Sequence, residues 1–180
     1  MDDAVTERCI GCAAIVPRVA GPIHRYMTSA PGCWALWGEL NAQLFSDPST
    51  APYRQLCVDA YAVQHPGTPG PQAVQSVAVH LISLYAQLEL GFPSDRMPSI
   101  VNSMLRTRGG FHWLTPPSFD NALTVAVVLR SARNLRVEAR DWATSAWHAW
   151  SAHHSQIRQW YEAERRRQSA GSAWLPGSNW

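Results

Sequence analysis

The chain has 180 residues, of which 46% are hydrophobic, and it carries a formal net charge of +2. This length and composition predict one globular domain with its own core, and the near-neutral charge argues against a general nucleic-acid surface. All 15 basic residues are arginine, which excludes lysine-dependent Schiff-base and P-loop chemistry.

The expected environment follows from the apolar runs and the cysteines. No apolar run approaches the ~20 residues of a membrane span, so we expect no membrane partner. The sequence starts Met1-Asp2-Asp3, and this acidic start is untypical of a signal peptide. We therefore expect a cytoplasmic protein whose four cysteines bind metal or remain free thiols.

Residues 1–8 read as a polar leader, and 9–27 as a knuckle followed by an irregular loop, because glycine and proline interrupt any regular period. The segment 9–33 has the pattern C-x2-C-x11-H-x8-C, which supplies three thiolates and one imidazole, a ligand set that zinc prefers. Ser29 is a suitable N-cap for the following helix, in whose first turn the last cysteine would lie. The predicted ligands of a structural zinc ion are Cys9, Cys12, His24 and Cys33.

Two other interpretations of this segment remain open. Three protein ligands and a water molecule can complete the metal site. Alternatively, Cys33 packs in the core, no metal binds, and Cys9 and Cys12 form a redox pair. Cys57 lies on an apolar helix face and is not expected to be a ligand.

Helical periodicity continues along most of the remaining chain. The predicted helices cover 33–46, 52–64, 72–90, 93–106, 123–129 and 136–167. The predicted fold is all-α, a single-domain helical bundle with an irregular zinc-knuckle-like loop at its N-terminal end. The metal-binding helical domain would cover 1–168, with the knuckle at 9–33 and a mobile tail at 169–180.

The predicted helix 72–90 carries an unusual stripe opposite its apolar face. The stripe is polar but holds no charged side chain, whereas a solvated helix face is normally dotted with charges. We therefore expect it to face a buried polar site. Its members are Gln72, Ser76, His80, Ser83 and Gln87.

Several histidines are predicted to lie in the interior of the bundle. His153 and His154 fall within or at the edge of the buried arc of the last helix, and His65 ends the second helix before Pro66. A second metal site or a metal-free acid–base pocket can form where such side chains meet, but purely structural histidines are an equally open reading. The candidates for this catalytic or second metal site are His65, His80, His154, His153, Asp59 and Tyr61.

Aromatic residues supply the candidate pocket. Trp113 lies in a proline-rich loop and can roof a site for a flat ligand. The loop with Arg25 and Tyr26 is expected to lie over the histidines, with Trp150 beside them.

Distinctive strings occur along most of the chain: Cys9-x2-Cys12, Gly21-Pro22-x-His24-Arg25-Tyr26, segments 31–36, 58–67 and 75–81, Trp113-Leu114-x-Pro116-Pro117 and Trp147-x2-Trp150-x2-His153-His154. On these strings the chain resembles an uncharacterised bacterial family of small Cys/His/Trp-rich proteins, a domain of unknown function. The resemblance covers the chain up to about Trp160. It implies no activity and supports only the choice of residues.

Two functions from different classes fit these features. The first is a metal-dependent enzyme that acts on a small molecule at the histidine-lined pocket, with a metal-bound water as the nucleophile. The alternative is a non-catalytic, zinc-stabilised helical module that binds a protein partner or a small ligand. A thiol redox protein is a third, weaker reading.

Overall fold

The structure is a computed structural model that describes residues 5–106, 110–131 and 135–172. A two-stranded antiparallel hairpin, β1 (Thr6–Arg8) and β2 (Ile15–Pro17), precedes the helices. The α-helices are α1 (Pro31–Ser46), α2 (Arg54–Gln64), α3 (Pro71–Leu88), α4 (Met97–Arg106), α5 (Val125–Arg130), α6 (Leu135–Ala149) and α7 (His154–Ser172). Short 3₁₀ helices are η1 (Pro48–Tyr53), η2 (Ser94–Arg96) and η3 (Ser151–His153). The all-α, single-domain prediction is confirmed.

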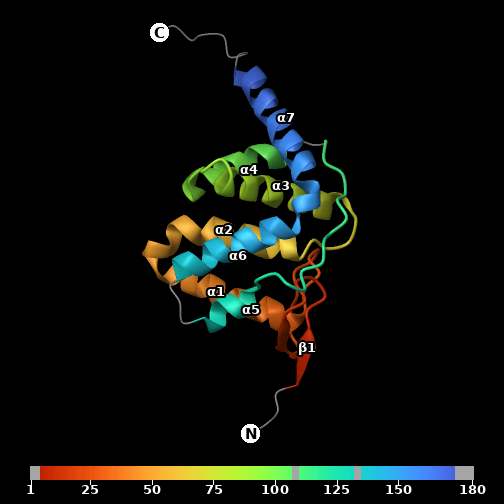
Figure 1. Ribbon diagram of the computed structural model, residues 1–180, viewed down its shortest axis with the longest axis vertical. Helices are drawn as coiled ribbons and strands as arrows, with labels where there is room; N and C mark the ends of the chain where they lie inside the picture. The colour runs from red at the N-terminus through yellow and green to blue at the C-terminus, as the bar shows by residue number, and fades with distance from the viewer. Residues whose placement is uncertain (1–4, 107–109, 132–134, 173–180) are drawn as a thin grey trace.

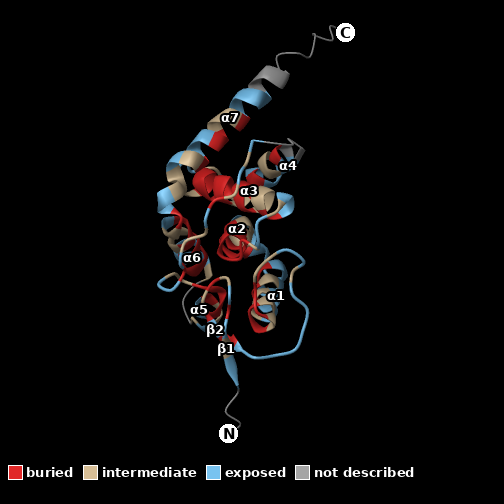
Figure 2. Ribbon diagram, turned by 90° about the vertical axis from the view of Figure 1, so that its right-hand side faces the viewer, coloured by how far each residue is buried: buried red, intermediate tan, exposed pale blue. Residues whose placement is uncertain are grey.

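Helix α2 lies at the centre of the molecule, with α3 and α4 on one side and α1 and α5 on the other (Figure 1). Eight of its 11 residues are buried, and the ribbon coloured by burial shows α2 surrounded by the other helices (Figure 2). A helix buried on most of its circumference has to satisfy its polar side chains internally. Any polar group on α2 therefore has a protein partner or a ligand.

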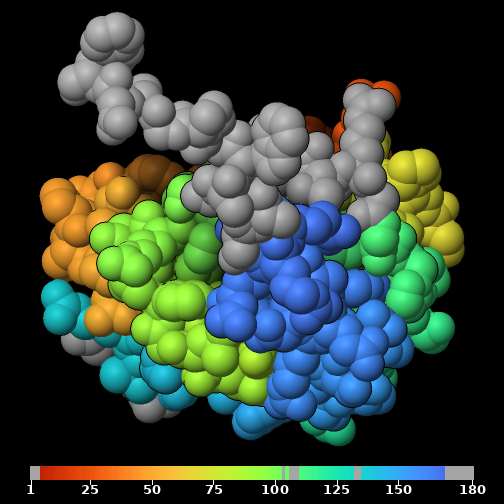
Figure 3. Space-filling view, turned by 90° about the horizontal axis from the view of Figure 1, so that it is seen from above, coloured from red at the N-terminus to blue at the C-terminus, as the bar shows by residue number. Residues whose placement is uncertain are grey.

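The C-terminal helix α7 packs on α3 and then extends past the layered part of the molecule (Figure 1). Seen from that end, the green atoms of α3 and α4 adjoin the blue atoms of α7 (Figure 3). Helix α7 continues to Ser172, beyond the predicted end at 167. The rest of the predicted mobile tail, 173–180, lies outside the described residues.

Three local predictions differ from the structure. The β1–β2 hairpin lies in residues predicted to be irregular, with β1 in the predicted polar leader 1–8 and β2 in the predicted loop 9–27. The N-cap of α1 is Ala30 rather than Ser29, and Ser29 makes no capping hydrogen bond. The single helix predicted over 136–167 is two helices, because the chain leaves helical geometry at Trp150 and passes through η3.

In the described part of the chain, no helix has both the length and the apolar character needed to cross a membrane.

Candidate metal centre

The β1–β2 hairpin positions the first two cysteines. Cys9 directly follows β1, and its amide donates to the Ala14 carbonyl at 2.8 Å, while the Ala13 amide donates back to the Cys9 carbonyl at 3.0 Å. Ala13 closes this turn with a positive φ of 62°, in the left-handed region. The turn places the thiols of Cys9 and Cys12 on the buried side of the hairpin.

The other two members of the site come from helix ends. Cys33 lies in the first turn of α1, and His65 is the C-cap residue of α2. The Nε2 atom of His65 lies 3.4 Å from the Cys33 Sγ and 3.5 Å from the Cys9 Sγ, and the Sγ atoms of Cys12 and Cys33 are 3.7 Å apart. The four ligand atoms lie within 4.8 Å of one another, and every residue is at most 1% exposed. This Cys3His centre consists of Cys9, Cys12, Cys33 and His65.

The imidazole of His65 is held in one orientation. Its Nδ1 lies 2.7 Å from the Tyr61 carbonyl oxygen, which can only accept a hydrogen bond, so Nδ1 carries the proton. In the neutral ring, Nε2 is then unprotonated and directed at the thiols, as in metal-bound histidines whose other nitrogen donates to a carbonyl. The ring of Tyr61 stacks on that of His65 at 4.0 Å, which fixes the imidazole plane.

Further donors are directed at the sulfur atoms. The Ala30 amide donates to the Cys9 Sγ at 3.4 Å, and the Tyr61 hydroxyl donates to the Cys33 Sγ at 3.8 Å. Hydrogen bonds of this kind stabilise thiolates and tune the electron density that sulfur gives to a metal. The centre therefore has a supporting layer of polar groups as well as four ligands.

The protein alone does not ionise the three thiols together. Hydrogen bonds with Cys12 and Cys33 lower the pKa of Cys9. Hydrogen bonds with Cys12 and Cys9, together with burial, raise the pKa of Cys33 far above its usual range. The hydrogen bond with Cys33 lowers the pKa of Cys12, but that with Cys9 and burial outweigh it and raise the pKa to about 12. A metal cation bound between the three sulfur atoms would allow all three thiols to ionise, because metal coordination stabilises thiolates.

The fourth ligand differs from the sequence prediction, since His65 and not His24 joins the thiols. His24 lies on the loop between β2 and α1, where its ring packs on Tyr26 at 4.4 Å and on Trp34 at 5.2 Å. Its Nδ1 is buried without a hydrogen-bond partner, and burial lowers its pKa. Sequence spacing favoured the nearer histidine, whereas the fold brings the end of α2 back to the hairpin.

The predicted convergence of histidines is also not observed. His65 belongs to the Cys3His centre, while His80 faces Asp59, with its Nδ1 2.7 Å from the Asp59 Oδ1. His154 stacks on Trp147 with ring centroids 3.7 Å apart, and the Nε2 of His153 lies 2.9 Å from the Thr115 carbonyl. Helix α2 separates the environments of His65 and His80. Of the six predicted residues, the structure brings together Asp59 with His80 and Tyr61 with His65.

The four predicted pocket residues lie on separate parts of the fold and differ in their exposure. Arg25 and Tyr26 are exposed on the loop before α1. Trp150 is fully buried and donates from its indole nitrogen to the Val63 carbonyl at 3.2 Å, and Trp113 is partly exposed. The aromatic residues thus serve mainly in packing, as large buried side chains commonly do.

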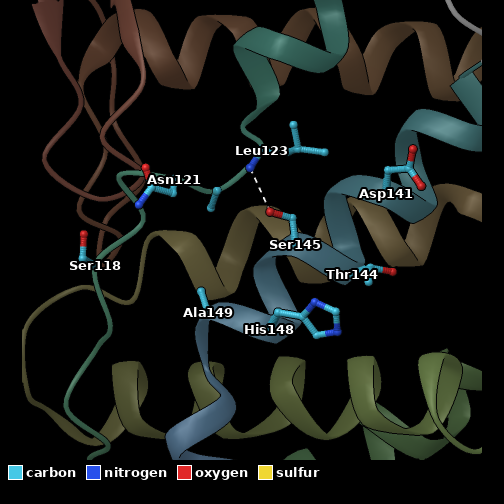
Figure 4. Close-up of a pocket in the computed structure, with 9 residues that line it drawn as sticks. Ser118, Asn121, Leu123, Asp141, Thr144, Ser145, His148 and Ala149 are labelled. Carbon is cyan, nitrogen blue, oxygen red and sulfur yellow. Dashed lines mark hydrogen bonds between the residues drawn. The ribbon is translucent and has the colours of Figure 1, made fainter.

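Sequence reasoning missed a cavity of about 570 Å³ between α6 and the segment 118–123 (Figure 4). Ser145 accepts a hydrogen bond from the Leu123 amide at 2.9 Å at its edge. No sequence signal marks it, because the lining side chains are ordinary exposed or partly exposed residues of α6 and of the segment 118–123. They are Ser118, Asn121, Ala122, Leu123, Asp141, Thr144, Ser145, His148 and Ala149.

A family model described as "Family of unknown function (DUF5946)" matches residues 7–151. The matched range contains the complete Cys3His centre together with Asp59 and His80, and it ends before His153 and His154. No curated protein and no solved structure matches the chain.

Proposed function

The chain belongs to this family of unknown function, and we propose that its Cys3His centre binds one zinc ion with a structural role. The supporting observation is the meeting of three thiols and one correctly oriented imidazole nitrogen in a buried site. Three soft ligands and one borderline ligand in this arrangement are typical of structural zinc sites.

The distances between the ligand atoms agree with zinc. Zinc–sulfur bonds of about 2.3 Å and zinc–nitrogen bonds of about 2.0 Å place tetrahedral ligands about 3.8 Å apart for two sulfurs and about 3.5 Å apart for sulfur and nitrogen. The Cys12–Cys33 separation is 3.7 Å, and the two sulfur–nitrogen separations are 3.5 and 3.4 Å. An ion can therefore enter with little rearrangement of the side chains.

A structural role follows from the completeness of the ligand set. Catalytic zinc sites keep one position for water or substrate, whereas four protein ligands close the coordination shell. The ligands also join three separate parts of the fold: the β1–β2 hairpin, the start of α1 and the end of α2. Zinc would fasten a hairpin of 3-residue strands, which has little core of its own.

Metal analysis of the purified protein tests this assignment. We expect one zinc ion per chain in the wild-type protein and in His24→Ala, and clearly less than one in His65→Ala and Cys33→Ser. Replacement by cobalt should give the intense visible absorption of tetrahedral thiolate coordination. Retention of zinc in His65→Ala together with its loss in His24→Ala would show that His24 is the fourth ligand, as the sequence predicted. That result would overturn the assignment of His65.

A closed zinc site favours the zinc-stabilised helical module over the metal-dependent enzyme, because a metal-bound water has no position in it. If the module binds a small ligand, the cavity beside α6 is the favoured binding site. Asp141, Thr144 and His148 offer it carboxylate, hydroxyl and imidazole groups on one helix face. We expect Thr144→Leu, which narrows the cavity, to abolish binding of small polar compounds in a thermal-shift screen, with the zinc content unchanged.

A further inference from the structure

Asp59 is a fully buried carboxylate in the middle of the central helix. It is 0% exposed, and the cost of burying a charge requires strong compensation. Four hydrogen-bond donors to the Asp59 carboxylate provide this compensation. The Oδ1 atom accepts from Gln55 Nε2 at 2.8 Å and from His80 Nδ1 at 2.7 Å, and Oδ2 accepts from the Ser83 hydroxyl at 2.6 Å and from Gln87 Nε2 at 2.8 Å.

The network fixes Asp59 from two helices and a third segment. Gln55 lies one turn before Asp59 on α2, while Ser83 and Gln87 lie on α3. The Oε1 atom of Gln87 in turn accepts from the Ser94 hydroxyl of η2 at 2.7 Å. Every donor is thus on a rigid element or is held by one. Such connected networks restrict a carboxylate to one position.

His80 is the member of this network that reaches the surface. Its side chain is 17% exposed, while that of its partner Asp59 is completely buried. Because the Asp59 carboxylate accepts at Nδ1, a neutral His80 carries its proton there and leaves Nε2 unprotonated. Among the described residues, no hydrogen-bond partner is found for this Nε2. The arrangement of a buried carboxylate, an oriented imidazole and an open nitrogen is that of a general base.

The polar stripe on α3 provides uncharged polar side chains on the same helix face as the His80 side chain. Gln72 and Ser76 precede His80 by two turns and one turn, so their side chains share its helix face. Gln72 is exposed and Ser76 is partly exposed. Amide and hydroxyl groups beside an imidazole are suited to a small, uncharged molecule that carries hydroxyl groups. The stripe predicted to face a buried polar site thus runs from the surface, through His80, into the Asp59 network.

We propose that His80 is a catalytic general base, positioned by Asp59, that acts on a water molecule or on a hydroxyl of a small substrate. The O–H bond breaks, its proton forms a bond with Nε2, and the electron pair of that bond stays on the oxygen, which becomes the nucleophile. The nucleophilic oxygen forms a bond with an electrophilic carbon of the substrate, and the bond from that carbon to the leaving group breaks with its electron pair on the leaving group. His80, now an imidazolium ion that the Asp59 carboxylate stabilises, gives its proton to the leaving group. This step needs no metal and is independent of the Cys3His centre.

The tautomer of His80 provides the first test. Long-range proton–nitrogen NMR on the zinc-loaded protein should find neutral His80 protonated at Nδ1, whereas free imidazole side chains favour Nε2. Asp59→Asn should abolish this preference. Protonation at Nε2 in the wild-type protein, or an imidazolium ion throughout the pH range in which the protein is folded, would overturn the proposal.

The second test uses p-nitrophenyl acetate as a probe of water activation. A positioned general base contributes about 10²-fold or more to a rate, so the hydrolysis rate of His80→Gln should be about 10²-fold or more below that of the wild-type protein. Glutamine can still donate to Asp59, which preserves the fold. His112→Gln is the matched control, because His112 is an exposed histidine outside both the Asp59 network and the cavity beside α6, and it should lose little.

The outcomes separate the proposal from a purely structural role. The rate should also fall in D₂O, because a proton moves in the rate-limiting step. Equal losses in His80→Gln and His112→Gln, or identical rates in H₂O and D₂O, would contradict a general base. If Asp59→Asn does not fold, the wild-type tautomer and the His80→Gln rate decide the question by themselves.

Discussion

Gly11 is the residue on which the geometry of the metal centre most directly depends. It lies between Cys9 and Cys12 in the turn of the hairpin, where the chain passes close to the end of α2. A Cβ at this position would overlap the Thr28 carbonyl oxygen and would press on the imidazole of His65. The absence of a side chain therefore lets the hairpin approach the histidine that completes the ligand set.

We predict that Gly11→Ala weakens both zinc binding and stability, because backbone atoms of residues 28 and 64 cannot move away from the new methyl group. A loss of roughly 1–3 kcal/mol in the free energy of unfolding is expected for overpacking of this kind. Chemical denaturation with parallel zinc analysis provides the measurement. Gly38→Ala is the matched control, since a Cβ there meets no atom within 4 Å. Equal effects at the two positions would contradict this role of Gly11.

At this scale, the sequence predicted the three thiol ligands but not the imidazole. Cys9, Cys12 and Cys33 lie close enough in sequence for spacing to carry information. His65 is much farther away in sequence, and its position in space depends on the path of α1 and η1, which determines where α2 ends. The available signal was local: Pro66 ends the helix and leaves His65 at its C-cap, a position from which a side chain can reach another segment.

At the scale of elements, most helices were predictable from apolar periodicity, and the two main errors have physical reasons. The strands of the hairpin have only 3 residues each, too few for alternation to be recognised. The break between α6 and α7 contains no proline or glycine. There Trp150 turns inward to donate to the Val63 carbonyl, so that tertiary packing overrides local helical preference.

Removal of the proposed zinc ion is predicted to loosen the hairpin before the helical core. The β1–β2 pairing has few buried neighbours besides the metal centre, whereas α2 is enclosed by α3 and α6. Hydrogen exchange after chelation should therefore accelerate at the amides of Cys9 and Arg18, which donate across the hairpin. The amides in the middle of α3 should change little. Uniform acceleration along the chain would show instead that metal loss unfolds the whole protein.

The junction between α6 and α7 predicts a pH-dependent contribution to stability. Burial lowers the pKa of His154 below the usual histidine value of about 6.5, so the unfolded chain binds a proton there more readily than the folded chain. The free energy of unfolding should therefore fall as the pH drops through about 6.5. Urea titrations at about pH 7.5 and about pH 5.5 should show a smaller difference for His154→Gln than for the wild-type protein. An unchanged difference would mean that His154 does not contribute.

For the whole molecule, side chains from distant parts of the chain join the helical layers. The indole nitrogen of Trp142 on α6 donates to the Gln64 Oε1 on α2 at 2.9 Å, and Glu89, after α3, pairs with Arg158 on α7 at 2.9 Å. The family model ends at residue 151, yet Ile157 and Trp160 on α7 are buried. Helix α7 is thus part of the packed structure.

We predict that Trp160→Ala lowers the free energy of unfolding by about 3–5 kcal/mol, the usual cost of removing a buried tryptophan side chain. Trp160 is 5% exposed and packs against Phe111 at 5.2 Å. Gln159→Ala, at an exposed position on the same helix, is the control and should change stability little. Thermal and denaturant unfolding are the measurements. A loss below about 1 kcal/mol would mean that α7 is only loosely attached.

All residues of the Cys3His centre lie within the first 65 positions of a chain of 180. During synthesis, the complete ligand set therefore leaves the ribosome before α3 and every later helix emerges. An ion captured at that stage would hold the hairpin, α1 and α2 together as a template on which the remaining helices assemble. Once they enclose it, the ion exchanges only as fast as the hairpin opens, so the supply of metal matters at the time of synthesis rather than during the life of the folded protein.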